Sequence, residues 1–120
     1  MARDTLLDFF QDFAGLTQEF LIYDDGFRSH HYRYDEVAAK AHAFAARLRE
    51  AGIRKDDKVI LYGENRPEWI IALWGCLLEG VVTVPIDYRS SPEFVERIDQ
   101  YARRMTRAWD APKKLTDWFV

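Results

Sequence analysis

The segment from Lys58 to Arg89 constrains the fold of this chain more than any other, because it holds two strand-like runs on either side of a helix-like run. Val59 to Leu61 are apolar and mostly β-branched, which predicts a short strand buried on both faces. Val81 to Val84 form a second run of this kind, and Pro85 is expected to end it. Two strands joined by one helix form a parallel pair with a right-handed crossover, so this segment predicts an α/β sheet.

The helix between these strands carries its own start and stop signals. Asn65 is the predicted N-cap because its side chain can accept from free amide groups, and Glu68 follows at the capping-box position. Pro67 is tolerated there because first-turn amide groups lack helical partners. The helix is expected to end near Glu79, with Gly80 as its C-terminal stop. Its broad apolar face comprises Trp69, Ile70, Leu73, Trp74, Leu77 and Leu78.

Upstream, the sequence predicts a helix, a hairpin and a longer helix. The first helix begins at Asp4 or Thr5. Strand-forming runs at 20–23 and 27–32 flank Asp25-Gly26, which predicts a tight hairpin turn. The second helix covers about 34–51 and ends before Gly52. The apolar stripes are Leu6, Phe9, Phe10 and Phe13 on the first helix, and Val37, Ala41, Phe44, Ala45 and Leu48 on the second.

Downstream, a third long helix opens at Ser90 or Ser91 with Pro92 and is expected to stop before Pro112. Its apolar positions are Phe94, Val95, Ile98, Tyr101, Ala102 and Met105. Residues 1–100 contain 12 basic and 18 acidic side chains, a net charge of −6, whereas residues 101–120 contain 5 and 2, a net charge of +3. This change of sign predicts a domain at 1–100 followed by a basic helical tail at 101–120.

Several motifs in order carry a resemblance. Residues 33–37, Arg-Tyr-Asp-Glu-Val, stand where one family has Thr-Tyr-x-Glu-Leu, and 57–59 match its Gly-Asp-x-Val with Asp56 in place of the glycine. Residues 81–87 match its Gly-x-Val-x-Val-Pro-Leu-Asp. Over roughly 20–98 the chain resembles the N-terminal region of the adenylate-forming (AMP-binding) synthetases, which include acyl-CoA synthetases, luciferases and peptide-synthetase adenylation domains. The wording GENRPEW is most similar to long-chain fatty acyl-CoA synthetases.

The resemblance implies an α/β fold: the N-terminal part of the synthetase large domain, with a β-hairpin, a parallel βαβ unit and flanking helices. It also implies a reaction, in which ATP activates a carboxylic acid, here a fatty acid, to an acyl-adenylate that is passed to CoA. ATP, Mg and CoA are the cofactors of the full-length family. Two local departures are Arg33, which cannot cap as threonine would, and Asp56, which lacks the backbone freedom of glycine.

The family's Ser/Thr/Gly-rich phosphate loop, its acidic residue for magnesium and ribose, and its mobile lysine all lie beyond the matched region. The six glycines are isolated from one another and form no phosphate cradle. We therefore assign no catalytic, cofactor-binding or metal-binding residue, and expect the chain to be an N-terminal fragment that binds no cofactor and is inactive alone. Divergence of the native sequence, a frameshift or truncation, and a gene fusion all remain open as origins of residues 101–120.

The other chemically suggestive residues have simpler interpretations. His30 and His31 point to opposite faces of a strand and cannot chelate one metal together, and His42 has no HExxH partner. Asp24-Asp25 and Asp56-Asp57 fall at turns, where aspartate bonds nearby backbone. Cys76 has no neighbouring histidine to activate it and is expected in the core, as are Trp69 and Trp74 unless they form an interface.

Partners and compartment follow from composition. Arg103, Arg104, Arg107, Lys113 and Lys114, with Tyr101, Trp109 and Trp118, could bind RNA or an acidic membrane, but a solvated face is expected because the chain is acidic overall. A single cysteine excludes an internal disulfide and, with no membrane-spanning run and no leader, indicates the cytoplasm. The alternative function is a protein-interaction module that self-associates or recruits a complementary synthetase fragment; a nucleic-acid binder is the third hypothesis.

Overall fold

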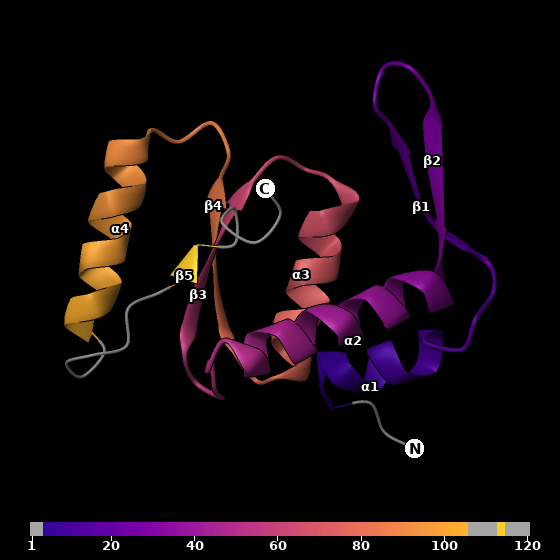
Figure 1. Cartoon of the computed structure of the whole chain (residues 1–120), viewed down its shortest axis with the longest axis horizontal. Helices are drawn as coiled ribbons and strands as arrows, with labels where there is room; N and C mark the ends of the chain where they lie inside the picture. The colour runs from indigo at the N-terminus through magenta and orange to yellow at the C-terminus, as the bar shows by residue number, and fades with distance from the viewer. Residues whose placement is uncertain (1–3, 106–112, 115–120) are drawn as a thin grey trace.

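The computed structural model describes residues 4–105 and 113–114, with side chains described as far as Tyr101. Four helices and five strands form along this part of the chain (Figure 1). In order they are α1 (Leu6–Phe13), β1 (Glu19–Asp24), β2 (Ser29–Arg33), α2 (Tyr34–Glu50), β3 (Lys58–Gly63), α3 (Pro67–Leu78), β4 (Val82–Asp87), α4 (Pro92–Met105) and β5 (Lys113–Lys114).

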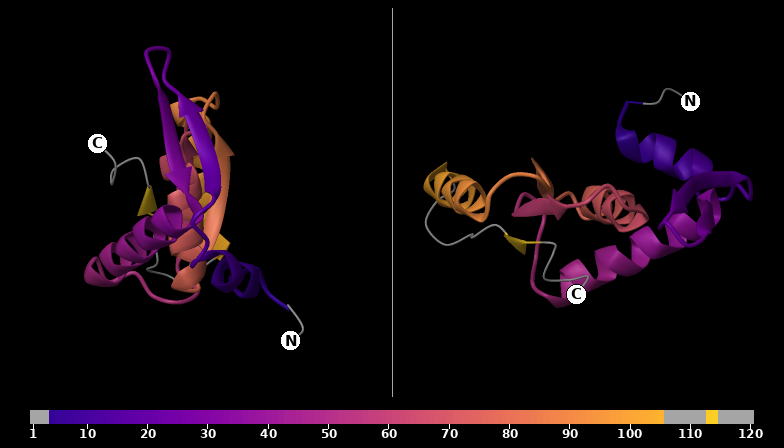
Figure 2. Two further views of the ribbon diagram at one scale, coloured as in Figure 1. Left: turned by 90° about the vertical axis from the view of Figure 1, so that its right-hand side faces the viewer. Right: turned by 90° about the horizontal axis from the view of Figure 1, so that it is seen from above.

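The predicted βαβ unit forms the centre of the molecule. β3 and β4 pair in parallel, from Lys58 opposite Val82 to Gly63 opposite Asp87, and α3 connects them. β5 lies parallel to β3 on its other side, so the strand order is β4-β3-β5. Seen from above, α4 lies on one side of this sheet and α3 and α2 lie on the other (Figure 2). The fold class and the parallel pair predicted from the sequence are thus confirmed.

β3 is buried on both faces, as its apolar run predicts. Val59 and Leu61 pack toward α2 and α3, in the largest core cluster. Ile60 packs on the opposite face, with Ile86 and Val95 of β4 and α4. Side chains alternate in this way because successive residues of a strand point to opposite faces of the sheet. β3 therefore packs against helices on both faces of the sheet.

α1, α2 and α3 pack together beside the sheet. Val37, Ala41, Phe44, Ala45 and Leu48, the predicted stripe of α2, are all buried. α2 meets α3 closely at Gly75, where an added Cβ would come within 2.6 Å of Phe44 Cδ1. Thr5 is the N-cap of α1: its hydroxyl accepts from the Asp8 N–H while the Asp8 carboxylate accepts from the Thr5 N–H. Phe10 then packs on Trp74, with ring centroids 5.5 Å apart.

The hairpin projects away from the helices (Figure 1), and its turn is longer than predicted. Its loop contains four residues, 25–28, because Asp24 pairs with Ser29. Gly26 alone in this loop has a positive φ, at 91°. The Asp25 carboxylate accepts from the Phe27 and Arg28 N–H groups, which stabilises the wider loop. The prediction that Phe27 lies in a strand is therefore wrong.

Two boundaries in the βαβ unit also differ from prediction. α3 has its N-cap at Arg66, with Pro67 in the first turn, and no side chain caps it; the predicted Asn65 cap and its capping box are wrong. β4 continues through Pro85 to Asp87. Proline is tolerated because β4 lies at the edge of the described sheet, where a missing N–H breaks no ladder hydrogen bond. Gly80, with φ of 69°, follows the helix as expected.

α4 begins as predicted, since the Ser91 hydroxyl accepts from the Phe94 N–H at 3.2 Å. Of its apolar positions, Val95 is buried and Ile98 is partly buried, whereas Phe94 and Tyr101 are exposed. The helix runs without a break across residue 100 to Met105. Residues 106–112 and 115–120 lie outside the described part, so the division into a domain and a basic tail stays a prediction.

Candidate functional site

A cleft of about 250 Å³ opens at the carboxyl ends of β3 and β4. Ligands of parallel α/β sheets bind at this edge, since the loops that follow the strands gather there. Its lining residues are Gly63, Asn65, Trp69, Pro85, Ile86, Asp87, Tyr88 and Arg89. The cleft is the feature of the βαβ unit that is best placed to contact a ligand.

The charged groups of this cleft are engaged with one another. The Arg89 guanidinium donates to both carboxylate oxygens of Asp87, at 3.2 and 2.8 Å, and the Arg89 N–H donates to the same carboxylate. The side-chain hydrogen bond from Arg89 lowers the pKa of Asp87 to about 2. Beside the cleft, the Tyr62 hydroxyl donates to the Ser90 carbonyl at 2.7 Å. The Asp87–Arg89 pair and the Tyr62–Ser90 hydrogen bond both stabilise the loop after β4.

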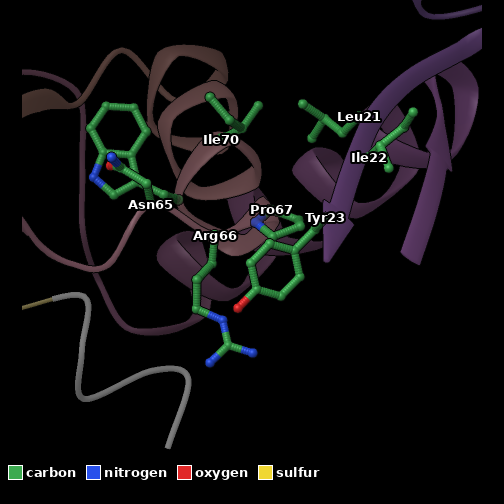
Figure 3. A pocket seen from close by; sticks show the side chains of 8 residues that line it. Leu21, Ile22, Tyr23, Asn65, Arg66, Pro67 and Ile70 are labelled. Carbon is green, nitrogen blue, oxygen red and sulfur yellow. The ribbon is translucent and has the colours of Figure 1, made fainter. Parts of the chain in front are cut away.

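A second cleft, of about 270 Å³, lies between the hairpin and the start of α3 (Figure 3). Leu21, Ile22 and Tyr23 of β1 form one wall, and residues 65–67, 69 and 70 form the other. The Arg66 guanidinium carbon lies 5.3 Å from the centroid of the Tyr23 ring. No sequence signal pointed to this site, because its walls are more than 40 positions apart and Arg66 belongs to a motif interpreted as a helix start.

A third cleft, of about 220 Å³, is lined by Tyr32, Lys40, Ala43, Phe44, Arg47, Glu68 and Ile71. One carboxylate oxygen of Glu68 is enclosed there without a hydrogen-bond partner. Its ion-pair partner is Arg66, with Nε 3.7 Å away, which is beyond hydrogen-bond distance. Glu68 thus lines the third cleft and is ion-paired with Arg66, which lines the second.

The histidines and turn aspartates lie where the simpler interpretations placed them. His30 Nε2 is 2.8 Å from Asp25 Oδ2, whereas His31 Nδ1 is 2.5 Å from Glu19 Oε2. The two rings thus face different carboxylates. The hydrogen bond with His30, followed by those from the Arg28 and Phe27 N–H groups, lowers the pKa of Asp25. The interpretation as surface hairpin residues is confirmed.

The remaining singled-out side chains are structural. Cys76 is fully buried, and burial raises the pKa of its thiol to about 12. The Asp57 carboxylate accepts from the Arg54 N–H at 2.7 Å. His42 is exposed and packs its ring on Phe10, with centroids 5.4 Å apart. Trp69 and Trp74 are partly buried against the core clusters.

The basic cluster predicted near the C-terminus lies almost entirely outside the described side chains. Of its aromatic members, Tyr101 is described and is exposed. Lys113 and Lys114 form β5 beside Val59 and Ile60 of β3. No membrane-crossing helix is present among the described residues, since none of their helices is both long and apolar enough.

Comparison with known proteins decides the family. A profile described as "AMP-binding enzyme" matches residues 11–103, which span α1 to α4. The chain belongs to the AMP-binding enzyme family. The resemblance drawn from its motifs is thus confirmed.

The chain matches only a small part of the length of curated members of the AMP-binding family. A medium/long-chain-fatty-acid–CoA/3-oxocholest-4-en-26-oate–CoA ligase of Mycolicibacterium smegmatis is 41% identical over 56 residues, covering 47% of this chain and 10% of the ligase. A 4-hydroxybutyrate–CoA ligase 2 of Metallosphaera sedula is 33% identical over 73 residues, covering 61% of this chain and 13% of the ligase. The chain therefore matches about a tenth of the length of such relatives.

Solved structures of AMP-binding enzymes share the fold. The N-terminal subdomain of Klebsiella oxytoca NpsA, in complex with anthranilyl-AMSN, superposes with a TM-score of 0.71 at 26% identity, over 79% of this chain and 24% of that one. The O-succinylbenzoate coenzyme A synthetase MenE of Bacillus subtilis, in complex with AMP, gives 0.65 at 28% identity, with the same coverage. The fold of this chain thus corresponds to about a quarter of each of these chains, which in NpsA is part of the N-terminal subdomain.

The AMP-binding family implies ATP and Mg, and the described residues do not fit these groups. At the β3–β4 edge Gly63 stands alone, and the Asp87 carboxylate is already bonded to Arg89. Within residues 4–105 and 113–114, no group of three or more His, Cys, Asp or Glu side chains could hold a metal ion. We therefore derive no step of the reaction from this part of the chain.

Proposed function

We propose that this chain supplies the N-terminal wall of the large domain of an AMP-dependent acyl-CoA synthetase. The observation that carries this proposal is the family match over residues 11–103, on a βαβ unit with the fold of an N-terminal subdomain. The family reaction joins a carboxylic acid to CoA through an acyl-adenylate. The name of the Mycolicibacterium smegmatis relative favours a fatty acid as the substrate class.

The role proposed for the chain itself is that of a rigid structural scaffold. Catalytic groups must be held by elements that packing keeps rigid. β3 has this property, because Val59, Ile60 and Leu61 are buried between helices on both faces of the sheet. The chain would present the ends of β3 and β4 as one fixed side of a site completed by other residues of the synthetase.

An ATP–pyrophosphate exchange assay tests the expected inactivity. The purified chain should show background exchange with fatty, acetic and aromatic acids, because catalysis of adenylation depends on groups preorganised around the phosphates. Exchange that rises with protein concentration, and that an Asp87→Asn variant abolishes, would overturn the proposal and assign the chemistry to the β3–β4 cleft.

Complementation in trans tests the scaffold role directly. The chain would be added to a family synthetase that lacks the segment matched here, and recovery of exchange is expected. A Gly75→Leu variant is the matched control, since Cβ at that position already collides with Phe44 and the altered fragment should not dock. If both fragments restore activity equally, or neither does, the proposed role is wrong.

A second candidate function is a non-catalytic interaction module. Val82 of β4 is 43% exposed and Phe94 of α4 is 41% exposed, and the outer edge of β4 has no strand partner among the described residues. Exposed apolar side chains beside a free strand edge favour association with another chain. This candidate predicts complex formation in the absence of any synthetase fragment.

A further inference from the structure

We propose that the hairpin tip, residues 24–28, docks into the cleft between the hairpin and α3 of a second copy of this chain, with Phe27 as the inserted side chain. Tip and cleft belong to the same chain, so two copies can make the contact twice. The inference goes beyond the proposed function, which assigns no role to the hairpin tip. It also concerns a different surface from the outer edge of β4.

Phe27 is an apolar side chain that no described residue covers. It is 98% exposed, the largest exposed fraction among the large apolar residues that the structure describes. The hairpin carries it beyond the helices (Figure 1). The Asp25 carboxylate accepts from the Phe27 and Arg28 N–H groups at 2.8 and 2.9 Å, which holds the loop in one shape. Because the loop is already ordered, Phe27 can enter another chain at a small cost in conformational entropy.

The cleft has the size and the lining for one such side chain. Its volume of about 270 Å³ lies below the range of roughly 300–1,000 Å³ that pockets for organic ligands occupy. Leu21 and Ile70 face each other across the opening (Figure 3), and Ile22, which also lines the cleft, is 61% exposed. Aromatic side chains inserted into apolar pockets are typical anchors of protein interfaces. One large apolar side chain therefore suits this cleft better than a whole organic ligand.

The charges of the tip and the cleft are complementary. Arg66 is the one charged residue that lines the cleft. The tip carries two carboxylates, of Asp24 and Asp25, and one guanidinium, of Arg28, so its net charge is −1. Arg66 is also ion-paired with Glu68, at 3.7 Å from Nε, but a guanidinium has five N–H donors and can serve a second carboxylate. Charge thus favours this tip as the occupant, in addition to the apolar fit of Phe27.

Reciprocal docking would close a dimer. The tip directly follows residues 21–23 along the hairpin, and these residues form one wall of the cleft. When two hairpins lie antiparallel, each tip therefore comes beside the cleft of the other copy. A contact that is made twice about a two-fold axis closes the assembly at two copies.

Light scattering after size-exclusion chromatography of the full chain tests the role of Phe27. Phe27→Ser should weaken dimer formation about hundredfold or more, because two aromatic anchors are lost at once. Phe9→Ser, at a 50% exposed position of α1, is the matched control and should dimerise normally. The loss caused by Phe27→Ser should be the same in a Val82→Lys chain, whose β4 edge opposes pairing. A monomeric unaltered chain at high micromolar concentration, or equal association of the Phe27→Ser and unaltered chains, would overturn the proposal.

A charge exchange tests that the tip meets this cleft. Arg66→Glu should weaken the dimer about tenfold, because it places a like charge against the carboxylates of the other copy's tip. Asp24→Lys in the same chain should restore the affinity, since opposite charges then meet again. No restoration, or an equal loss for Arg97→Glu at an exposed position of α4, would assign the contact to another surface and overturn the proposal. If Arg66→Glu fails to fold, Phe27→Ser still decides the outcome, because Phe27 is exposed.

Discussion

Asp56 and Gly80 meet in the structure with the same left-handed backbone, with φ of 72° and 69°, and the Asp56 N–H donates to the Gly80 carbonyl at 3.0 Å. Next to this bond, the Val82 N–H donates to the Asp57 carbonyl at 2.8 Å. The two bonds join the segments that enter β3 and β4. Parallel pairing then begins directly, with Lys58 opposite Val82.

Substitution of Asp56 should therefore act through the backbone. Asp56→Gly is expected to leave the free energy of unfolding unchanged or to raise it by up to about 1 kcal/mol, since glycine removes left-handed strain but adds entropy to the unfolded chain. Asp56→Val should lower it by about 1–2 kcal/mol. Urea titrations followed by tryptophan fluorescence would measure the free energy of unfolding of both variants. Equal midpoints for Asp56→Gly and Asp56→Val would contradict the left-handed backbone at residue 56.

The contact between α2 and α3 should not accept a side chain at Gly75. A Cβ there would lie 2.6 Å from Phe44 Cδ1 and 3.0 Å from the Ala41 carbonyl oxygen, and Phe44 is buried. Gly75→Ala is therefore expected to destabilise the fold by about 1–3 kcal/mol, despite the better helix propensity of alanine. Gly15→Ala is the matched control, with open space around its Cβ. Thermal melts in which both variants behave alike would refute the close packing.

A capping side chain should stabilise the start of α3, because its N-cap residue is Arg66 and no side chain caps the helix. Arg66→Ser should raise the free energy of unfolding by about 0.5–1 kcal/mol. Asn65→Ala should be nearly neutral, in contrast to the loss expected if Asn65 were the cap. Chemical denaturation decides between them: a loss near 1 kcal/mol for Asn65→Ala would restore the cap predicted from the sequence.

The Cys76 thiol should make stability depend on alkaline pH. Its pKa rises from 9.0 to about 12 on burial, so the unfolded chain loses this proton at lower pH than the folded chain does. The stabilising contribution is complete below pH 9 and is lost as pH rises toward 12. Cys76→Ala should flatten this part of the pH profile in denaturation experiments. Rapid reaction of the native thiol with a disulfide reagent near neutral pH would contradict its burial.

The chain should associate through the free edge of β4. Val82 of β4 is 43% exposed, Tyr88 directly after the strand is 47% exposed, and no strand pairs with this edge within the described residues. Val82→Lys is expected to shift the population toward monomer, because edge lysines oppose strand pairing. Light scattering after size-exclusion chromatography measures this shift. A monodisperse monomer of the unaltered chain at high micromolar concentration would exclude the association.

The sequence alone predicted the parts of the fold that depend on local periodicity. The apolar run at 59–61, the stripe of α2 and the stop at Gly80 all lie where the pattern places them. These features need no knowledge of distant residues, because helix and strand periods determine which side chains can share a face. The family motifs could also be identified from the sequence, because each lies within a short continuous segment of the chain.

Tertiary structure decided the rest. The strand continues through Pro85 because β4 lies at the edge of the sheet that the described residues form, and the hairpin loop widens because Asp25 accepts from two backbone N–H groups within it. The cleft at Tyr23 and Arg66 exists because β1 and the start of α3 lie on either side of it, although they lie far apart in sequence. Periodicity carries no information about such pairs, since the distance between two elements is determined by the core that both of them cover.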